Sequence, residues 1–259
     1  METTGLLDPF PLWSILPLTI VIGLASFEFG YRLAHYRQQQ HQEEKETPVG
    51  GMVAGTLGLL AFMLAFTFGL AGARFEDRRK VVLDEANAVG TTYLRAEMLP
   101  EPMSTEVKNL LREYVDLRVG AVQQQPEKLN EAVSKSEALQ ERLWAQAVAV
   151  TEKDRSPIAA LFVDSLNSVI DLHATRVMTG LRSRVPAVIW IVLYVLAVLA
   201  MEMIGYHAGL ANSRRSIAAV ALIIGFALVL FLIADLDRPG QGLLSVSQQA
   251  MIDLRNSMK

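Results

Sequence analysis

The chain has 259 residues, of which 51% are hydrophobic and 20% are charged. This composition is too apolar for an ordinary water-soluble domain and too charged for a protein that lies wholly in lipid. The net charge of −3 is inconsistent with nucleic-acid binding, which needs a strongly basic surface. The absence of cysteine excludes disulfides, thiolate metal sites and a cysteine nucleophile.

Four segments are long and apolar enough to cross a membrane as helices, which takes about 20 residues each. They cover approximately residues 11–31, 50–75, 185–206 and 216–235. The first is too long for the apolar core of a cleavable signal, and no basic residues precede it. Amphipathic aromatic residues stand in or near the ends of the spans, as expected at a membrane interface: Trp13, Tyr31, Trp190, Tyr194 and Tyr206. The sequence therefore predicts an all-α polytopic membrane protein with four transmembrane helices.

A helical soluble domain is predicted between the second and third spans, over residues 76–184. The second span should continue into water as one helix until the prolines that begin at Pro100. Ser104 is a candidate N-cap for the next helix, Pro126 opens a further one, and Ser156 with the proline after it opens the last. Each helix carries one apolar stripe, so we expect the helices to form a bundle.

The expected domain order follows from these segments. It comprises a first transmembrane pair in residues 1–75, the soluble domain in 76–184, a second transmembrane pair in 185–236 and a C-terminal tail in 237–259.

An even number of spans places both termini and the soluble domain on one side of the membrane. Eight basic residues flank the spans on that side: Arg74, Arg78, Arg79, Lys80, Arg176, Arg182, Arg184 and Arg238. The opposite loops carry five: Arg32, Arg37, Lys45, Arg214 and Arg215. Because basic residues favour the cytoplasmic side, we expect the domain and both termini to be cytoplasmic.

The second span is unusual in its small residues and its aromatic stripe. Small residues let helix backbones approach closely, and three glycines stand near its start: Gly51, Gly55 and Gly58. An apolar stripe follows at three- and four-residue spacing: Leu59, Phe62, Phe66 and Leu70. Repeated around a ring of subunits, this stripe would form a narrow apolar neck that gates by dewetting. The alternative is ordinary packing among the four helices of one chain, which periodicity alone favours.

Two acids, Asp235 and Asp237, stand where the fourth span ends. Calcium takes 6–8 oxygen ligands, so a calcium site here would need further carboxylates. The candidates for this second acidic source are Glu76, Asp77, Asp84 and Glu85. The alternative is that the two aspartates form interfacial ion pairs with Arg238 or with the basic cluster that begins at Arg78.

Two further acids, Glu28 and Glu202, lie inside or at the edge of spans, where ionisable groups are costly and often functional. Glu28 can instead reach the interface and pair with Arg32. Glu202 lies deeper and is a candidate for an ion path or for pairing between helices. His173 lies on the apolar stripe of its helix, which indicates a core histidine rather than a metal ligand. No phosphate-binding loop, metalloprotease or nucleophile-elbow motif is present, so we do not expect an enzyme.

Two stretches carry a resemblance to a known family. "LAFTFGLAGARFEDRRKVVLDEANAVGTTYLRAE" and the later "DLDRPGQG" resemble a bacterial bestrophin-like family of four-span membrane proteins, from about Gly50 to Leu254. Bestrophins are pentameric anion channels with a hydrophobic neck on the second helix. The resemblance implies that Phe62 and Phe66 fall near neck positions, and that Asp235 and Asp237 occupy the place of a calcium-binding acidic cluster. The residues that echo the bestrophin motif after the neck are Arg74, Phe75, Glu76 and Arg78.

We therefore expect a homo-oligomeric ion channel, pentameric by the resemblance, in the inner membrane of a bacterium. Its partners would be the lipid bilayer, ions and further copies of the chain. No cofactor is expected, with calcium as the one candidate. The alternative is a non-conducting membrane scaffold or sensor whose helical domain binds a partner. A transporter fits less well, since neither extra spans nor repeated halves are seen.

Overall fold

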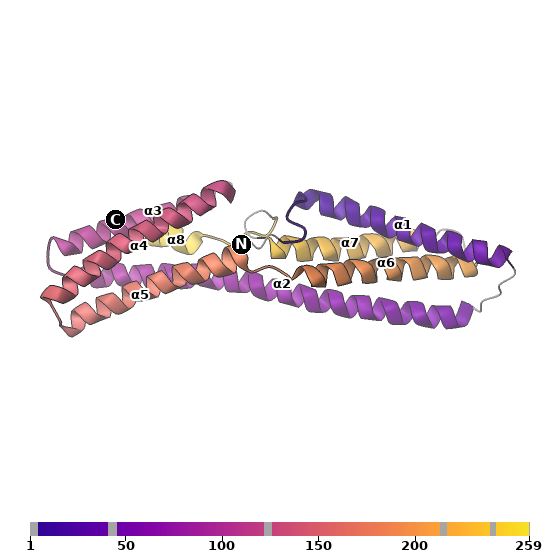
Figure 1. Ribbon diagram of the computed structural model, residues 1–259, viewed down its shortest axis with the longest axis horizontal. Helices are drawn as coiled ribbons and strands as arrows, with labels where there is room; N and C mark the ends of the chain where they lie inside the picture. The colour runs from indigo at the N-terminus through magenta and orange to yellow at the C-terminus, as the bar shows by residue number, and fades with distance from the viewer. Residues whose placement is uncertain (1–4, 41–45, 122–125, 213–216, 239–241, 259) are drawn as a thin grey trace. The chain divides into compact units, whose positions relative to one another are not determined.

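The computed structural model describes residues 5–40, 46–121, 126–212, 217–238 and 242–258, and every regular element in these ranges is helical (Figure 1). Three flanking charges named above, Lys45, Arg214 and Arg215, lie outside these ranges. The helices are α1 Leu12–Gln39, α2 Glu46–Ala96, α3 Met103–Ala121, α4 Pro126–Lys153, α5 Pro157–Val177, the π-helical turn η1 Met178–Arg182, α6 Ala187–Leu210, α7 Ile217–Asp237 and α8 Gln249–Ser257.

The chain divides into two compact units. The span unit contains Met1–Phe75 and Arg184–Leu244, and the helical unit contains Glu76–Ser183 and Ser245–Lys259. The sequence suggested a separate C-terminal tail over residues 237–259. In the structure the part up to Leu244 belongs to the span unit, and the part from Ser245 belongs to the helical unit, where α8 packs on α3. The helix α2 contributes its first part to the span unit and its second part to the helical unit.

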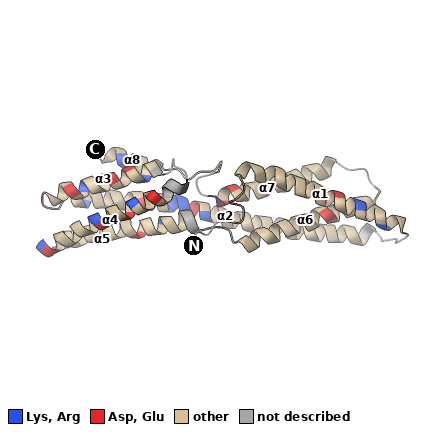
Figure 2. Cartoon of the chain, turned by 45° about the horizontal axis from the view of Figure 1, so that its top comes forward, with Lys and Arg blue, Asp and Glu red and all other residues tan. Residues whose placement is uncertain are grey.

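Four helices are long and apolar enough to cross a membrane, namely α1, α2, α6 and α7. This finding and the helical content of the described residues confirm the predicted all-α, four-span fold class. Within the span unit, α1 packs along α6 and α7 (Figure 1). Figure 2 shows that α6 and α7 carry few charged residues, whereas charges are frequent on α3, α4 and α5. Apolar side chains suit the lipid-facing spans, and charged ones suit helices in water.

Glycines permit the close approach of α1 and α6. A Cβ atom added to Gly30 would collide with the carbonyl oxygen of Glu202, and one added to Gly205 would collide with that of Phe27. Gly209 likewise lies against Ala34. The two backbones are therefore in contact, which is how transmembrane helices gain packing energy in the absence of a hydrophobic driving force.

The helical unit has its own apolar core. Large side chains of α3, α4 and α5 are fully buried there: Leu111, Tyr114, Leu143, Phe162 and Leu166. Burial of one such side chain stabilises the fold by about 1.5–3 kcal/mol. Since these residues come from three helices, the bundle arrangement predicted for the soluble domain follows from their shared core.

The boundaries of the helices agree with the sequence at two positions and differ at one. Helix α4 begins at Pro126, and Ser156 caps α5 through its Oγ, which accepts from the backbone N–H of Ala159 at 3.3 Å. The predicted cap at Ser104 is wrong, because α3 begins one residue earlier at Met103. The backbone N–H groups of Met103 and Ser104 both donate to the carbonyl of Pro100, so the preceding turn already satisfies them.

Candidate functional site: the second span and the buried charges

The first part of α2 buries one stripe in the span unit. Leu60, Leu64, Thr67 and Ala71 are buried and recur at three- and four-residue spacing, so they lie on one face of the helix. Thr67 satisfies its hydroxyl within the helix by donating to the carbonyl of Met63 at 2.8 Å. This face holds the helix against the remaining spans.

The predicted neck residues lie mostly off this buried face. Phe62 is 65% exposed, Phe66 is 57% exposed and Leu59 is half-exposed, while Leu70 is partly buried. The glycines before them are also uncovered, since a Cβ added to Gly51, Gly55 or Gly58 meets no atom within 4 Å. Packing within one chain, the alternative left open by the sequence, therefore does not account for this face among the described residues.

The exposed face of α2 differs in composition from that of its neighbours. Exposed large side chains on α6 and α7 are mainly branched aliphatics: Val188, Ile191, Val192, Val195, Leu199, Ile217, Val220, Leu222, Ile224, Leu228, Val229 and Leu232. Between Gly51 and Ala73, α2 exposes mainly glycine, alanine and phenylalanine, together with Met52 and Leu59, and neither valine nor isoleucine. Small residues mark helix–helix contact in membranes, whereas branched aliphatics suit lipid.

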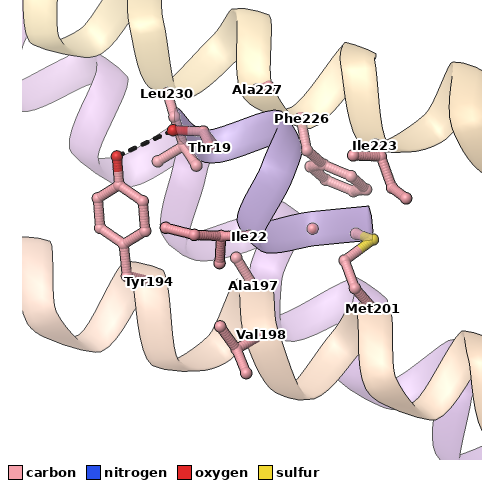
Figure 3. Close-up of a pocket in the computed structure, with 11 residues that line it drawn as sticks. Thr19, Ile22, Tyr194, Ala197, Val198, Met201, Ile223, Phe226, Ala227 and Leu230 are labelled. Atoms are coloured by element: carbon pink, nitrogen blue, oxygen red, sulfur yellow. Dashed lines mark hydrogen bonds between the residues drawn. The ribbon is translucent and has the colours of Figure 1, made fainter. Parts of the chain in front are cut away.

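A small cavity lies between α1, α6 and α7 in the span unit (Figure 3). Its walls are apolar except for Thr19 and Tyr194, whose hydroxyl oxygens are 3.1 Å apart. At about 20 Å³ it has room for roughly one water molecule. No residue of α2 lines it, so this cavity does not provide an ion path through the protomer.

The motif residues after the neck have different surroundings. Arg74 Nη1 lies 4.0 Å from Asp237 Oδ1, at the limit of an ion pair. Phe75 is partly buried against the apolar core of the span unit. Glu76 is exposed and pairs with Arg79, whereas Arg78 is buried.

The two aspartates that close α7 are buried and accept backbone hydrogen bonds. The carboxylate of Asp235 accepts from the N–H groups of Leu243 at 2.7 Å and Leu244 at 3.0 Å. That of Asp237 accepts from the N–H of Val185 at 2.8 Å. Gly242 is required here, because a Cβ at this position would collide with the Asp235 carboxylate. The acids therefore fix the turn after α7 and the start of α6.

An ionic clamp, which the sequence did not reveal, joins the N-terminal segment to this turn. Arg238 donates to the backbone carbonyls of Leu7 and Phe10, the latter at 2.8 Å, and its Nε lies 3.9 Å from Asp8. Arg184 donates to the same Asp8 carboxylate at 3.1 Å and to the carbonyl of Asp237 at 2.6 Å. The sequence offered Arg238 as a partner of the closing aspartates; in the structure the charges of Asp237 and Asp235 do act on Arg238, and that of Asp8, which the sequence did not suggest, acts on it more strongly.

These contacts do not fit a calcium site at Asp235 and Asp237. Both oxygens of Asp235 and one of Asp237 already accept amide hydrogens, and a calcium ion needs 6–8 oxygen ligands. No group of three or more acidic or histidine side chains that could hold a metal is present among the described residues. Among the acids proposed as further calcium ligands, Glu85 already forms ion pairs with two arginines. Calcium binding remains a prediction that a titration can test.

The two acids inside the spans have separate positions. Glu28 accepts from Arg32 Nε at 2.7 Å, one turn further along α1, which is the interfacial pair that the sequence offered as its simpler explanation. Glu202 lies partly buried on α6. Its assignment to an ion path remains a prediction.

The helical unit holds a buried charged cluster centred on Glu85, which is 0% exposed. Arg176 donates to one carboxylate oxygen, and the other accepts from Tyr114 at 2.6 Å and lies 3.2 Å from Arg118 Nε. Burial raises the pKa of Glu85, but the positive charges of Arg176 and Arg118 outweigh it and hold the pKa below its usual value. His173 Nδ1 lies 3.3 Å from the Tyr114 hydroxyl.

A signal for this cluster existed in the sequence. Glu85 falls on the apolar stripe of α2, between Val82 and Val89, where a carboxylate needs a partner. The partners could not be read from the sequence, because Arg176 is 91 residues away.

Three comparisons place this architecture among known proteins. The family described as Bestrophin-like domain matches residues 20–251. A crystal structure of a bacterial bestrophin homologue from Klebsiella pneumoniae is similar with a TM-score of 0.63 and 13% identity, over 94% of this chain and 96% of that one. The structure of a point variant of that homologue is similar with a TM-score of 0.68, at the same identity and coverage. A further crystal structure, described as that of a membrane protein, is similar with a TM-score of 0.63 and 13% identity, over 95% of this chain and 97% of that one. No curated protein matches the chain.

Proposed function

Because this chain belongs to the bestrophin-like family, whose domain spans residues 20–251, we propose that it is a homo-oligomeric ion channel. Its pore would be lined by α2 and narrowed by Phe62 and Phe66. Membership of this family also confirms the expectation that the chain is not an enzyme.

The observation that carries the proposal is the uncovered face of α2. Gly51, Gly55 and Gly58 leave open space beside the helix, and Phe62 and Phe66 follow on the exposed surface. A glycine-rich face gains little from lipid but allows another helix to approach closely. Further copies of α2, meeting around a common axis, are the occupants that suit this face. A pentamer is the number that the family resemblance suggests.

The neck itself would act by dewetting. Phe62 and Phe66 are four residues apart, which places their rings about 6 Å apart along the helix axis. In a ring of subunits they would form two successive apolar layers. A water column in such a constriction is unstable, so ions cross only when the ring widens. Nothing in this mechanism requires a charged side chain at the neck.

The proposed orientation places the helical unit and both termini in the cytoplasm of a bacterium, with the spans in its inner membrane. The support is the excess of basic residues next to the spans on that side. Two of these charges are held by ion pairs with Asp8: Arg184, which is partly buried just before α6, and Arg238, which is buried just after α7.

A second candidate function is a non-conducting scaffold or sensor. The observation that favours it is the set of exposed apolar side chains on the helical unit: Trp144, Val148, Ile158 and Leu161. Surfaces of this kind are common at protein–protein contacts. In this case the helical unit would bind a partner and the spans would serve as an anchor.

Ion flux into proteoliposomes separates the two functions. We expect the wild-type protein to conduct weakly and the double variant Phe62→Ala, Phe66→Ala to conduct more, because smaller side chains widen and wet the neck. Leu228→Ala, at an exposed position of α7, is the matched control and should leave the flux unchanged. If wild type and double variant both leave the liposomes impermeable to common cations and anions, the channel proposal fails.

A further inference from the structure

The charged cluster of the helical unit contains the only histidine of that unit, His173 on α5. Its side chain is 3% exposed, and its Nδ1 lies 3.3 Å from the hydroxyl of Tyr114 on α3. That hydroxyl in turn donates to Glu85 on α2 at 2.6 Å. The histidine is therefore the end of a short hydrogen-bonded chain that crosses three helices.

The direction of these bonds fixes the tautomer of His173. An ionised carboxylate can only accept, so the single proton of the Tyr114 hydroxyl points to Glu85. The hydroxyl oxygen can then only accept from His173, which places the imidazole proton on Nδ1. Nε2 keeps its lone pair, is buried, and has no hydrogen-bond partner among the described residues. It is the one atom of this chain of bonds that is free to take up a proton.

The surroundings of that atom oppose a positive charge. The titratable and charged groups that face His173 are Glu85 from α2, Tyr114 and Arg118 from α3, and Arg176 from α5 itself. One negative charge thus already faces two positive ones, and a proton on Nε2 would add a third positive charge. Burial, and then the charge of Arg118, lower the pKa of His173 to about 4.

Arg176 connects this cluster to the C-terminal segment. Its side chain is 13% exposed, against 6% for that of Arg118, so it is the arginine with more freedom to move. While one nitrogen holds Glu85, Nη2 donates to the side-chain oxygen of Gln248 at 2.7 Å. Gln248 immediately precedes α8. Repulsion that displaces Arg176 therefore removes the first contact of the docked segment.

The rest of the docking is made by apolar contacts and by hydrogen bonds at the far end of α8. Met251 is fully buried beside Val82 and Ala86 of α2. At the other end of α8, the carbonyl of Met258 accepts from Arg112 Nε at 2.6 Å and from the Tyr93 hydroxyl at 3.3 Å. A nine-residue helix is too short to be stable without such contacts. Loss of the contact between Arg176 and Gln248 should therefore shift the equilibrium of α8 measurably toward the undocked state.

We propose that Nε2 of His173 is a proton-binding site and that a proton bound there weakens the docking of the C-terminal segment, residues 245–258, on the helical unit. The inference is independent of ion conduction, since every group in it belongs to the helical unit.

The docking can be measured by the distance between two spin labels in the full-length protein. The chain has no cysteine, so Ser134→Cys on α4 and Asn256→Cys on α8, both at exposed positions, define a unique pair. If undocking of the segment returns the pKa of His173 to its ordinary value near 6.5, the ratio of undocked to docked molecules should rise by up to ~30-fold as the pH falls from 7.5 to 5.0.

His173→Asn is the decisive variant, because the asparagine amide can still donate to Tyr114 but has no site for an added proton. In this variant the ratio of undocked to docked molecules should stay constant over the same pH range. The proposal is overturned if the wild type shows no rise, or if His173→Asn shows the same rise as the wild type. Asp116→Asn, which removes the exposed ion pair with Arg255 on α8, is the control and should keep the rise.

Two further measurements apply even if His173→Asn folds poorly. Nitrogen NMR of labelled histidine should show His173 with its proton on Nδ1 at pH 7 and taking up a second proton only well below the ordinary pKa of 6.5; a proton on Nε2 at pH 7 would overturn the proposal. Gln248→Ala should leave this titration in place and reduce the pH effect on docking to less than about threefold. An undiminished effect would show that the signal does not pass through Arg176.

Discussion

Replacement of Glu85 by glutamine tests the charged cluster most sharply. The substitution keeps the size of the side chain and removes the only negative charge between Arg118 and Arg176. Tyr114 can still donate to the amide oxygen, so the hydrogen-bonded chain is largely kept. What changes is that two guanidinium groups then face each other in a buried site without a compensating negative charge.

The expected magnitude follows from the burial of the group. Removing one partner of a buried ion pair costs about 3–5 kcal/mol, because the remaining charge has no compensation. An exposed pair contributes about 0–1 kcal/mol. The pair between Arg142 and Glu113, at 3.5 Å and about 60% exposed on both sides, supplies the matched control, Glu113→Gln.

Hydrogen exchange of the full-length protein in detergent locates the effect. Peptides from α3 and α5 in Glu85→Gln should exchange roughly 10²- to 4 × 10³-fold faster, since about 1.4 kcal/mol corresponds to a factor of ten. Peptides from α6 and α7 should be unchanged. If Glu85→Gln accelerates exchange no more than Glu113→Gln does, the cluster does not stabilise the helical unit as we argue.

Three further predictions concern pH, packing and calcium. The pKa of His173 in the folded protein, about 4, lies below the ordinary 6.5, so the unfolded state binds the proton more readily. The free energy of unfolding of the helical unit should therefore fall by about 3 kcal/mol as the pH drops from 6.5 to 4. Denaturant titrations at several pH values measure this fall, which should be absent in His173→Asn. Gly205→Ala should lower the melting temperature, because its Cβ meets the Phe27 backbone and overpacking costs about 1–3 kcal/mol, whereas Gly225→Ala, which points into open space, should not. Calcium should leave the melting temperature of the wild type unchanged; stabilisation that disappears in Asp235→Asn would restore the calcium site.

The spans and the long second helix were predictable, because hydropathy and proline positions act locally along the chain. The 51-residue length of α2 follows from the absence of a helix breaker before Pro100. The cap at Ser156 also depends only on neighbouring residues. The prediction of a cap at Ser104 was wrong because the preceding turn already makes the hydrogen bonds that a cap would make. The geometry of that turn cannot be inferred from the residue type alone.

Contacts between distant segments were not predictable from one sequence. The glycine pair Gly51 and Gly55 drew attention to α2, yet the close approach within the chain uses Gly30 and Gly205. Small residues indicate that a helix can be approached, but their spacing does not name the partner. For the same reason Asp8 was missed, since its partner Arg184 is 176 residues away.

An electron cryomicroscopy map of the protein in lipid nanodiscs tests the central claim most directly, because it shows how many copies assemble and which helix faces their common axis. The account predicts a closed ring with the first part of α2 innermost and the side chains of Phe62 and Phe66 at its narrowest point. A monomer, or a ring whose axis is occupied by lipid or lined by α6 or α7, would contradict it.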